Sequence, residues 1–299
     1  MRKLIVLGVV GLLAQLVDGS LGMAYGVTSS TLLLATGVAP AAASAAVHFS
    51  EIGTSFISGV SHHKLGNVDW RTVSILAVPG FVGAFAGATF LANLDGEAAE
   101  PWVAGLLLLL GGYVIWRFLA LNGRRPQFKA HPSPLFLAPM GVVAGITDAI
   151  GGGGWGPVGT TSLLSSGRLE PRKVIGSIDT AEFVVAVGGS LGFLFALGSQ
   201  GILWGYAVAL LIGGVIAAPV AAWLVSRIPA AVLGVAAGGL IVVTNAQTIL
   251  LAVGMAQTPV LLTCAALAAF WIFGIVWAVR RHRAGIAVVE EEEREPVPV

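Results

Sequence analysis

Long apolar runs are the feature that most limits how this chain can fold. Residues 102–120, 202–225 and 260–279 carry almost no charge, and each is about as long as the roughly 20 residues that cross the ~30 Å hydrocarbon core of a membrane. Across the chain 56% of residues are hydrophobic and 10% are charged, whereas soluble domains have roughly 25% charged residues. We therefore expect an all-α polytopic membrane protein embedded in the lipid bilayer.

Charge and cysteine content argue against several other classes. The formal net charge is +1 and the arginines sit at the ends of apolar runs, so we expect no nucleic-acid partner. Cys264 is the single cysteine, and a thiol–disulfide carrier needs two. His62 and His63 are adjacent but lack further ligands near them in sequence, so we expect no metal site and no cofactor.

Two glycine-rich stretches form an internal repeat. Residues 18–34 read DGSLGMAYGVTSSTLLL and residues 148–164 read DAIGGGGWGPVGTTSLL. Aligned on their aspartates, they match Gly22 with Gly152, Tyr25 with Trp155, Gly26 with Gly156 and Thr31 with Thr161; farther on, His48 matches Asp179, Glu51 matches Glu182 and Gly80 matches Gly214. Residues 1–19 resemble a signal peptide, but we expect them to be retained because they lead into the first copy of the repeat.

The repeat predicts the organisation of the chain. We expect a first transmembrane repeat at residues 1–121, a polar cytoplasmic connector at 122–134 and a second repeat at 135–251. An extra C-terminal transmembrane helix at 252–283 and an acidic disordered tail at 284–299 follow. Because interior glycine and proline disfavour helix, each repeat should open with a broken unit, at residues 4–36 and 135–166. Each unit is either a re-entrant loop or a pair of short helices, and three transmembrane helices follow it.

Loop charges predict that the two repeats have inverted topology. Lysine and arginine gather in loops 61–71, 122–134, 168–173 and 280–283, whereas loop 93–101 is acidic. Basic loops lie in the cytoplasm of membrane proteins, which places both ends of each broken unit on one side and the C-terminus in the cytoplasm. Inverted repeats with paired interrupted helices are typical of transporters that bind substrate near the membrane midplane.

The broken units predict a site for a small anion. Free N–H groups at the start of a helix attract negative charge, and here each start is followed by hydroxyl side chains. The expected substrate-binding residues are Gly22, Tyr25, Gly26, Thr28, Ser29, Gly152, Gly153, Gly154, Trp155, Gly156, Thr160 and Thr161. The alternative is that the glycines only allow helices to pack closely.

Ionisable residues inside the apolar segments give a second signal. HFSE at 48–51 and DTAE at 179–182 place paired groups on one helix face, about 12 Å from the helix starts at Pro40 and Pro171. A charge at such depth costs about 2.5–3.5 kcal/mol unless it has a partner. Expected proton-coupling or site-supporting residues are Asp18, His48, Glu51, Asp148, Asp179 and Glu182. Alternatively these groups bond exposed backbone, and Asp18 and Asp148 cap the helices that follow them.

Several motifs resemble the sulfite exporter (TauE/SafE) family of membrane permeases. They are GLLAQLVDGSLGMAYGVTSSTLLL, GVVAGITDAIGGGGWGPVGTTSLL and GSIDTAEF, and the resemblance extends to about residue 279. It implies a cell (inner) membrane protein that moves small sulfur-containing anions, such as sulfite or organosulfonates, usually outward. The first half keeps only GSLGMAYG of the glycine run, so the two halves need not contact substrate equally.

The combined interpretation is a secondary transporter, and not an enzyme. It would hold a small anionic substrate at the broken helices and work by alternating access, coupled to protons or alternatively to sodium. The chain is compatible with a homo-oligomer. A membrane-embedded enzyme and a scaffold subunit of sulfur metabolism are the alternatives; an enzyme would need a nucleophile or metal set that Cys264 and scattered histidines do not provide.

Overall fold

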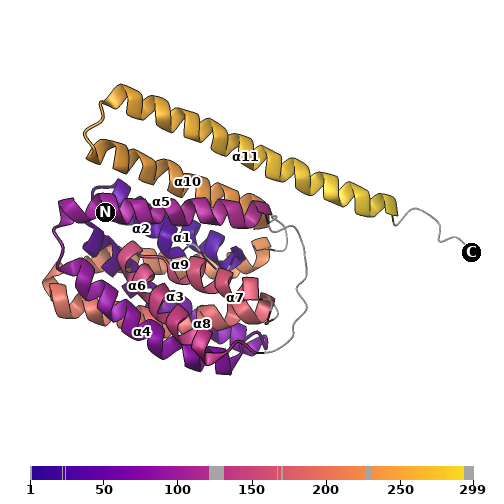
Figure 1. Cartoon of the computed structure of the whole chain (residues 1–299), viewed down its shortest axis with the longest axis horizontal. Coiled ribbons are helices and arrows are strands. Elements are labelled where there is room, and N and C mark those ends of the chain that lie inside the picture. The colour runs from indigo at the N-terminus through magenta and orange to yellow at the C-terminus, as the bar shows by residue number, and fades with distance from the viewer. Residues whose placement is uncertain are drawn as a thin grey trace, which may run out of the picture.

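The computed structural model describes residues 2–21, 23, 25–120, 131–166, 168–169, 171–225 and 230–292. All the regular elements in these ranges are helical (Figure 1), which confirms the all-α class. The helices are α1 (Arg2–Leu21), α2 (Tyr25–Ala35), α3 (Pro40–Lys64), α4 (Trp70–Ala92), α5 (Gly96–Ala120), α6 (Pro134–Gly151), η1 (Gly156–Thr160), α7 (Thr161–Ser166), α8 (Pro171–Leu197), η2 (Ser199–Gly201), α9 (Trp204–Val225), α10 (Ala230–Ala252) and α11 (Gln257–Glu292).

The helix order repeats along the chain. A pair of helices separated at glycines opens each half, α1 with α2 and α6 with the π-helical turn η1 and α7. Three long helices then follow in each half, α3 to α5 and α8 to α10, while α11 comes last and stands outside this order. The helices after the breaks start at Tyr25 and Gly156, where the repeat predicted them. Each broken unit is therefore a longer helix followed by a shorter one.

Among the described residues, five helices are long and apolar enough to cross a membrane. They contain the segments Trp70–Ala92, Ala98–Trp116, Pro134–Gly151, Lys173–Leu197 and Gln257–Arg281. Shorter apolar stretches lie in α1, α9 and α10. The more polar α3 is 25 residues long, so at 1.5 Å per residue it also exceeds the ~30 Å of a bilayer core. The protein is a multi-pass membrane protein.

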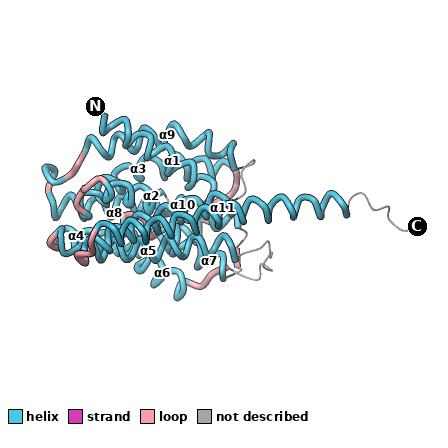
Figure 2. The backbone as a smooth tube through the Cα atoms, turned by 90° about the horizontal axis from the view of Figure 1, so that it is seen from above, coloured by secondary structure: helices cyan, strands magenta, loops and turns pink. Residues whose placement is uncertain are grey.

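Helix α11 lies at the edge of the bundle. It packs beside α10 and runs past the other helices (Figures 1 and 2), and only 6% of its apolar window is buried. The helix continues to Glu292, and the disordered tail at residues 284–299 stays a prediction. Alanine and glutamate are strong helix formers, and here they extend the preceding helix. Residues 293–299 lie outside the described ranges.

The two halves are packed into each other rather than side by side. Helix α1 lies along α9 and α6 lies along α4, while α3 packs on α8 and α5 packs on α10. Close packing of α6 on α4 depends on small residues: a Cβ added to Gly145 would lie 2.9 Å from the backbone nitrogen of Ala84. Some glycines therefore do serve helix packing. The core of the protein lies between the halves, where the broken units meet.

Candidate functional site

The two glycine breaks touch at the centre of the bundle. A Cβ on Gly26 would lie 2.6 Å from the Cα of Gly153, and one on Gly153 would overlap the backbone nitrogen of Val27. The Ser30 hydroxyl donates to the carbonyl oxygen of Gly152 at 2.9 Å. Gly152 itself has φ of 65°, a left-handed conformation that glycine adopts without strain. Only residues without side chains allow two backbones to cross this closely.

Each broken unit carries an aspartate that caps the helix after its break. The Asp18 carboxylate accepts a hydrogen bond from the Tyr25 N–H at 3.2 Å, and the Asp148 carboxylate accepts one from the Trp155 N–H at 2.9 Å. The capping contacts that were one alternative for these aspartates are therefore present in both halves. A cap uses one carboxylate oxygen, so the second oxygen of each aspartate is left for other contacts.

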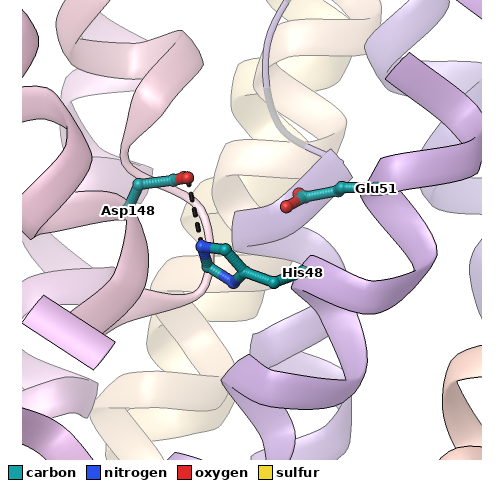
Figure 3. A group of neighbouring side chains, drawn as sticks. All are labelled: His48, Glu51 and Asp148. Atoms are coloured by element: carbon teal, nitrogen blue, oxygen red, sulfur yellow. Dashed lines mark ion pairs between the residues drawn. The ribbon is translucent and has the colours of Figure 1, made fainter. Parts of the chain in front are cut away.

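His48, Glu51 and Asp148 form a buried group beside the crossing (Figure 3). The second Asp148 oxygen lies 3.3 Å from His48 Nε2, and both side chains are at most 1% exposed. His48 Nδ1 lies 3.0 Å from the carbonyl oxygen of Ser44. Since a carbonyl only accepts, a hydrogen bond at Nδ1 requires this nitrogen to carry the hydrogen, which leaves Nε2 facing the Asp148 carboxylate.

Glu51 is the least satisfied member of this group. The side chain is 1% exposed, and neither carboxylate oxygen has a hydrogen-bond partner among the described residues. One oxygen faces the crossing, since a Cβ on Gly26 would lie 2.8 Å from it. One ligand atom from each of Glu51, His48 and Asp148 falls within 4.8 Å of the others, a spacing at which they can share a proton or a small cation. A buried carboxylate without a partner is costly unless it is protonated or neutralised.

A small polar cavity continues from Glu51 between α3 and α8. Its volume is about 10 Å³, and it is lined by Gln15, Asp18, Tyr25, Glu51, Thr54, Ser55, Ser58, Asp179 and Glu182. Serines from α3 hold the two α8 carboxylates: Ser55 donates to Glu182 at 3.2 Å, and Ser58 donates to Asp179 at 2.9 Å. The cavity therefore connects acidic groups from both halves.

The structure places the sequence-predicted residues in several parts of the fold. Gly26, Gly152, Gly153, His48, Glu51 and Asp148 meet at the crossing, and Asp18, Tyr25, Asp179 and Glu182 line the cavity. Thr28 and Ser29 are buried on α2, and their hydroxyls have no hydrogen-bond partner within the described ranges. The second break and η1 contain Gly154, Trp155, Gly156 and Thr160. Gly154 packs against the last turns of the preceding helix α6, close to Thr147. Gly22 and the side chain of Thr161 lie outside the described residues.

The aromatic residues after the breaks have structural contacts. Trp155 is fully buried, its indole N–H donates to the carbonyl oxygen of Ile178 at 3.0 Å, and its ring fills the space above Gly80. Tyr25 occupies the corresponding place in the other half, 3.4 Å from a Cβ added to Gly214. Each half thus provides a glycine that makes room for an aromatic ring of the other half.

Sequence reasoning missed several polar residues on α3 that belong to this region. Ser44 donates to the carbonyl oxygen of Ala149 at 2.6 Å, and His62 Nε2 lies 3.3 Å from the Asp179 carboxylate. Ser44 precedes His48 by four residues, and Ser55, Ser58 and His62 follow Glu51 at spacings of four, three and four residues. Such spacing places side chains on one helix face, so the signal was present in the sequence.

Comparison with known proteins identifies the family. The family described as "Sulfite exporter TauE/SafE" matches residues 7–248. The chain belongs to the sulfite exporter TauE/SafE family. It is 49% identical over 286 residues to the "Probable membrane transporter protein YtnM" of Bacillus subtilis (strain 168), a match that covers 94% of each chain. The resemblance of the glycine motifs is confirmed: this is a protein of a membrane transporter family and not an enzyme.

More distant relatives match about half of the chain. A "Probable membrane transporter protein" of Haemophilus influenzae is 27% identical over 155 residues, covering 48% of this chain and 55% of its own. The "Probable membrane transporter protein YdhB" of Bacillus subtilis (strain 168) is 25% identical over 142 residues, covering 47% and 58%. No solved structure matches this TauE/SafE protein.

Proposed function

We propose that this TauE/SafE protein is a secondary transporter of small sulfur-containing anions, such as sulfite or organosulfonates, that moves them outward together with protons. The observation that carries the proposal is the crossing of the two glycine breaks. Near that crossing lie the Thr28 and Ser29 hydroxyls and the Glu51 carboxylate, which are buried and have no hydrogen-bond partner among the described residues. Irregular backbone is tolerated at membrane depth only where protein buries it or where it lines a cavity.

The donors for an anion come from the start of α2. Thr28 and Ser29 offer hydroxyls that are buried and lack partners in the described part of the chain. The first N–H groups of a helix have no partner within it, and in α2 only the Tyr25 N–H is used by Asp18. An anion bound beside Gly26 would therefore meet backbone and hydroxyl donors that are already oriented.

The acids near this place support proton coupling. Each ionised carboxylate about 4 Å from a bound anion would oppose it by about 4 kcal/mol at the effective dielectric typical of proteins. Glu51, Asp148 and Asp18 lie at or beside the crossing. An anion could bind there only with protons, or with sodium as the alternative, neutralising the nearest carboxylates.

Reciprocal packing supports an arrangement of two inverted repeats. The α1–α9 and α6–α4 contacts exchange equivalent helices, as do the Tyr25–Gly214 and Trp155–Gly80 contacts. A two-fold axis in the membrane plane would relate such pairs. With the basic loops in the cytoplasm, the axis would pass near the crossing, and rocking of the halves would open the site to each side in turn.

Flux measurements with the purified protein in liposomes test the proposal. We expect saturable movement of at least one anion among sulfite, thiosulfate, sulfate and organosulfonates. The rate should depend on a pH gradient and remain unchanged when sodium is replaced by potassium. Absence of flux for every anion would refute the transporter proposal, and dependence on sodium alone would refute proton coupling. Conversion of substrate by protein in detergent, without vesicles, would favour the enzyme alternative.

Substitution of Asp148 separates its cap from its contact with His48. Asn caps a helix as well as Asp does, so Asp148→Asn should keep the unfolding temperature but lose most transport, because it removes the carboxylate beside His48. Asp148→Ala should also lose the cap, which costs about 1 kcal/mol. Thermal unfolding in detergent and liposome flux measure the two effects.

The matched control is Asp69, which caps α4 by accepting from the Thr72 N–H at 2.8 Å. Asp69→Asn should change neither stability nor flux. Wild-type flux in Asp148→Asn would mean that Asp148 acts only as a cap.

A further inference from the structure

Helix α3 carries an unbroken polar stripe from the crossing to its C-terminal end. His48, Glu51, Ser55, Ser58 and His62 follow one another at intervals of three and four residues, so they lie on one face. Between His48 and His62 the helix rises about 21 Å at 1.5 Å per residue. His48 is fully buried, whereas the side chain of His62 is 23% exposed. The stripe therefore joins the buried acids to the surface near the α3–α4 loop.

The acids of α8 face this stripe. His62 contacts Asp179, Ser58 donates to the same carboxylate, and Ser55 donates to Glu182. Asp18, on the neighbouring wall of the cavity, interacts electrostatically with His62 and Asp179. Helix α9, which also packs on α3, contains no Asp, Glu, Lys, Arg or His, and Arg71 of α4 is exposed. Lys173 of α8 donates to the carbonyl oxygen of Val68 in the α3–α4 loop, and the described groups that interact with His62 are the carboxylates of Asp179 and Asp18.

The corresponding stripe on α8 becomes apolar after Asp179 and Glu182. The repeat matches Ser55 with Ala186, Ser58 with Gly189 and His62 with Phe193. Phe193 is fully buried, and its ring lies 5.8 Å from that of His48 in an edge-on arrangement. The His62–Asp179 contact and the Phe193–His48 contact therefore occupy equivalent places in the two halves. The side chain of His62 is titratable and partly exposed, whereas that of Phe193 is apolar and fully buried.

We propose that His62 is the entrance of a one-sided proton path. Protons pass between the surface at the α3–α4 loop and Asp179, Glu182 and Glu51. Because Phe193 closes the equivalent place in the other half, they leave toward the second side only through the substrate site, when rocking of the halves opens that site there. The inference rests on the proposed transport function and adds the route of its coupling ion. The cavity of about 10 Å³ beside Glu51 has the room for about one water molecule, which can carry a proton between carboxylates. The side chain of Phe193, by contrast, has no atom that can accept a proton.

Two transport measurements isolate this role. Net transport driven by a pH gradient requires the protein to take up and release a proton in every cycle. Exchange of labelled for unlabelled anion at saturating concentration and equal pH does not require that release. A residue that only conducts protons should therefore affect the first measurement and spare the second.

His62→Gln is the deciding variant, and His63→Gln is its matched control. His63 is the exposed neighbour and packs on Trp70, 5.4 Å between ring centroids. We expect His62→Gln to slow net sulfite transport about 10-fold or more, since positioned side chains speed proton transfer by roughly 10²–10⁴-fold. Sulfite exchange should stay near the wild-type rate. His63→Gln should leave both unchanged. A normal net rate in His62→Gln, or an equal loss in His63→Gln, would overturn the proposal.

A loss of exchange in His62→Gln would also overturn it, because it would show that His62 supports structure or substrate binding. If the wild-type protein moves sulfite and His62→Gln keeps the normal rate of net transport driven by a pH gradient, the proposed proton path is refuted but the transport proposal is not. If the wild-type protein moves no tested anion, the transport proposal fails with it.

Phe193→His tests the closed side separately. A titratable side chain at this place, beside His48, should let protons reach the buried acids from the second side. We expect liposomes with this variant to lose a pH gradient faster than wild-type liposomes when no anion is present. A gradient that decays at the wild-type rate, with the unfolding temperature preserved, would show that Phe193 does not close the path.

Discussion

Replacing Gly153 with alanine is expected to abolish transport and to destabilise the protein. The added Cβ would overlap the backbone nitrogen of Val27 and lie 2.7 Å from its Cα. Backbone atoms cannot rotate away as a side chain can, so the two breaks must separate. Overpacking of this kind costs about 1–3 kcal/mol, and a shift of about 1 Å can reduce the rate of a positioned site by about 10²-fold. Liposome flux and thermal unfolding in detergent measure the two effects.

Gly112→Ala is the matched control for this substitution. Gly112 lies inside α5, and a Cβ added there meets no atom within 4 Å. Since alanine favours helix over glycine by about 1 kcal/mol, this variant should be at least as stable as the wild type and fully active. Full activity in Gly153→Ala would show that contact between the breaks is not needed for transport.

Replacing Glu51 with glutamine is expected to abolish proton-driven net transport while sparing anion exchange. Glutamine has the shape of a protonated glutamate, so the anion should meet a permanently neutral group in place of one that gains and loses a proton. Both Glu51 oxygens lack partners in the described structure, so the substitution breaks no hydrogen bond in that part of the molecule. Net flux should fall about 10²-fold or more, by the usual effect of losing a proton-transfer group, and exchange should no longer vary with pH.

Two comparison variants make the Glu51 result decisive. Glu100→Gln changes a carboxylate near the start of α5, away from the crossing, and should have no effect. Glu182→Gln should lose net flux as Glu51→Gln does, because both carboxylates line the same cavity. If neither substitution at the cavity changes flux, the acids serve only structure. If the protein is a scaffold subunit, none of the three variants has flux to lose.

Local sequence patterns predicted the order of the elements. Proline at Pro40 and Pro171 marks the helix starts of α3 and α8, because its fixed φ suits the first helical turn. The glycines and aspartates of the two repeat copies marked the breaks, and the aspartate caps are local contacts over seven residues. Long apolar runs are set by bilayer thickness. These features depend on residues that are near one another in the chain, so they can be read from it.

The end of α11 shows how a preceding helix affects a charged segment. The acidic segment after residue 283 was expected to be disordered because of its charge, yet it continues as helix to Glu292. Once a helix has started, each further residue adds a hydrogen bond at little cost. Helix formers next to an existing helix therefore extend it where an isolated segment of the same composition would not fold.

The sequence predicted individual residues of the site but not which of them contact one another. The sequence singled out His48, Glu51, Asp148, Asp179 and Glu182 as buried acids and bases, but gave no sign of which would touch. Contacts such as His48 with Asp148, and His62 with Asp179, join residues about 100 or more positions apart. Helical spacing on α3 would have added Ser55, Ser58 and His62, since these follow from the period of 3.6 residues.

The sequence by itself determined a membrane protein of two similar halves, each with a broken first helix, because apolar length, glycine and proline act through the local backbone and the solvent. Only the tertiary structure decided that the breaks touch, that each half holds an aromatic ring of the other, and that His62 and Phe193 occupy equivalent places with opposite chemistry. These outcomes depend on how rigid helices fit against one another across the halves, and packing of that kind is fixed by the shape of the whole bundle rather than by any one segment.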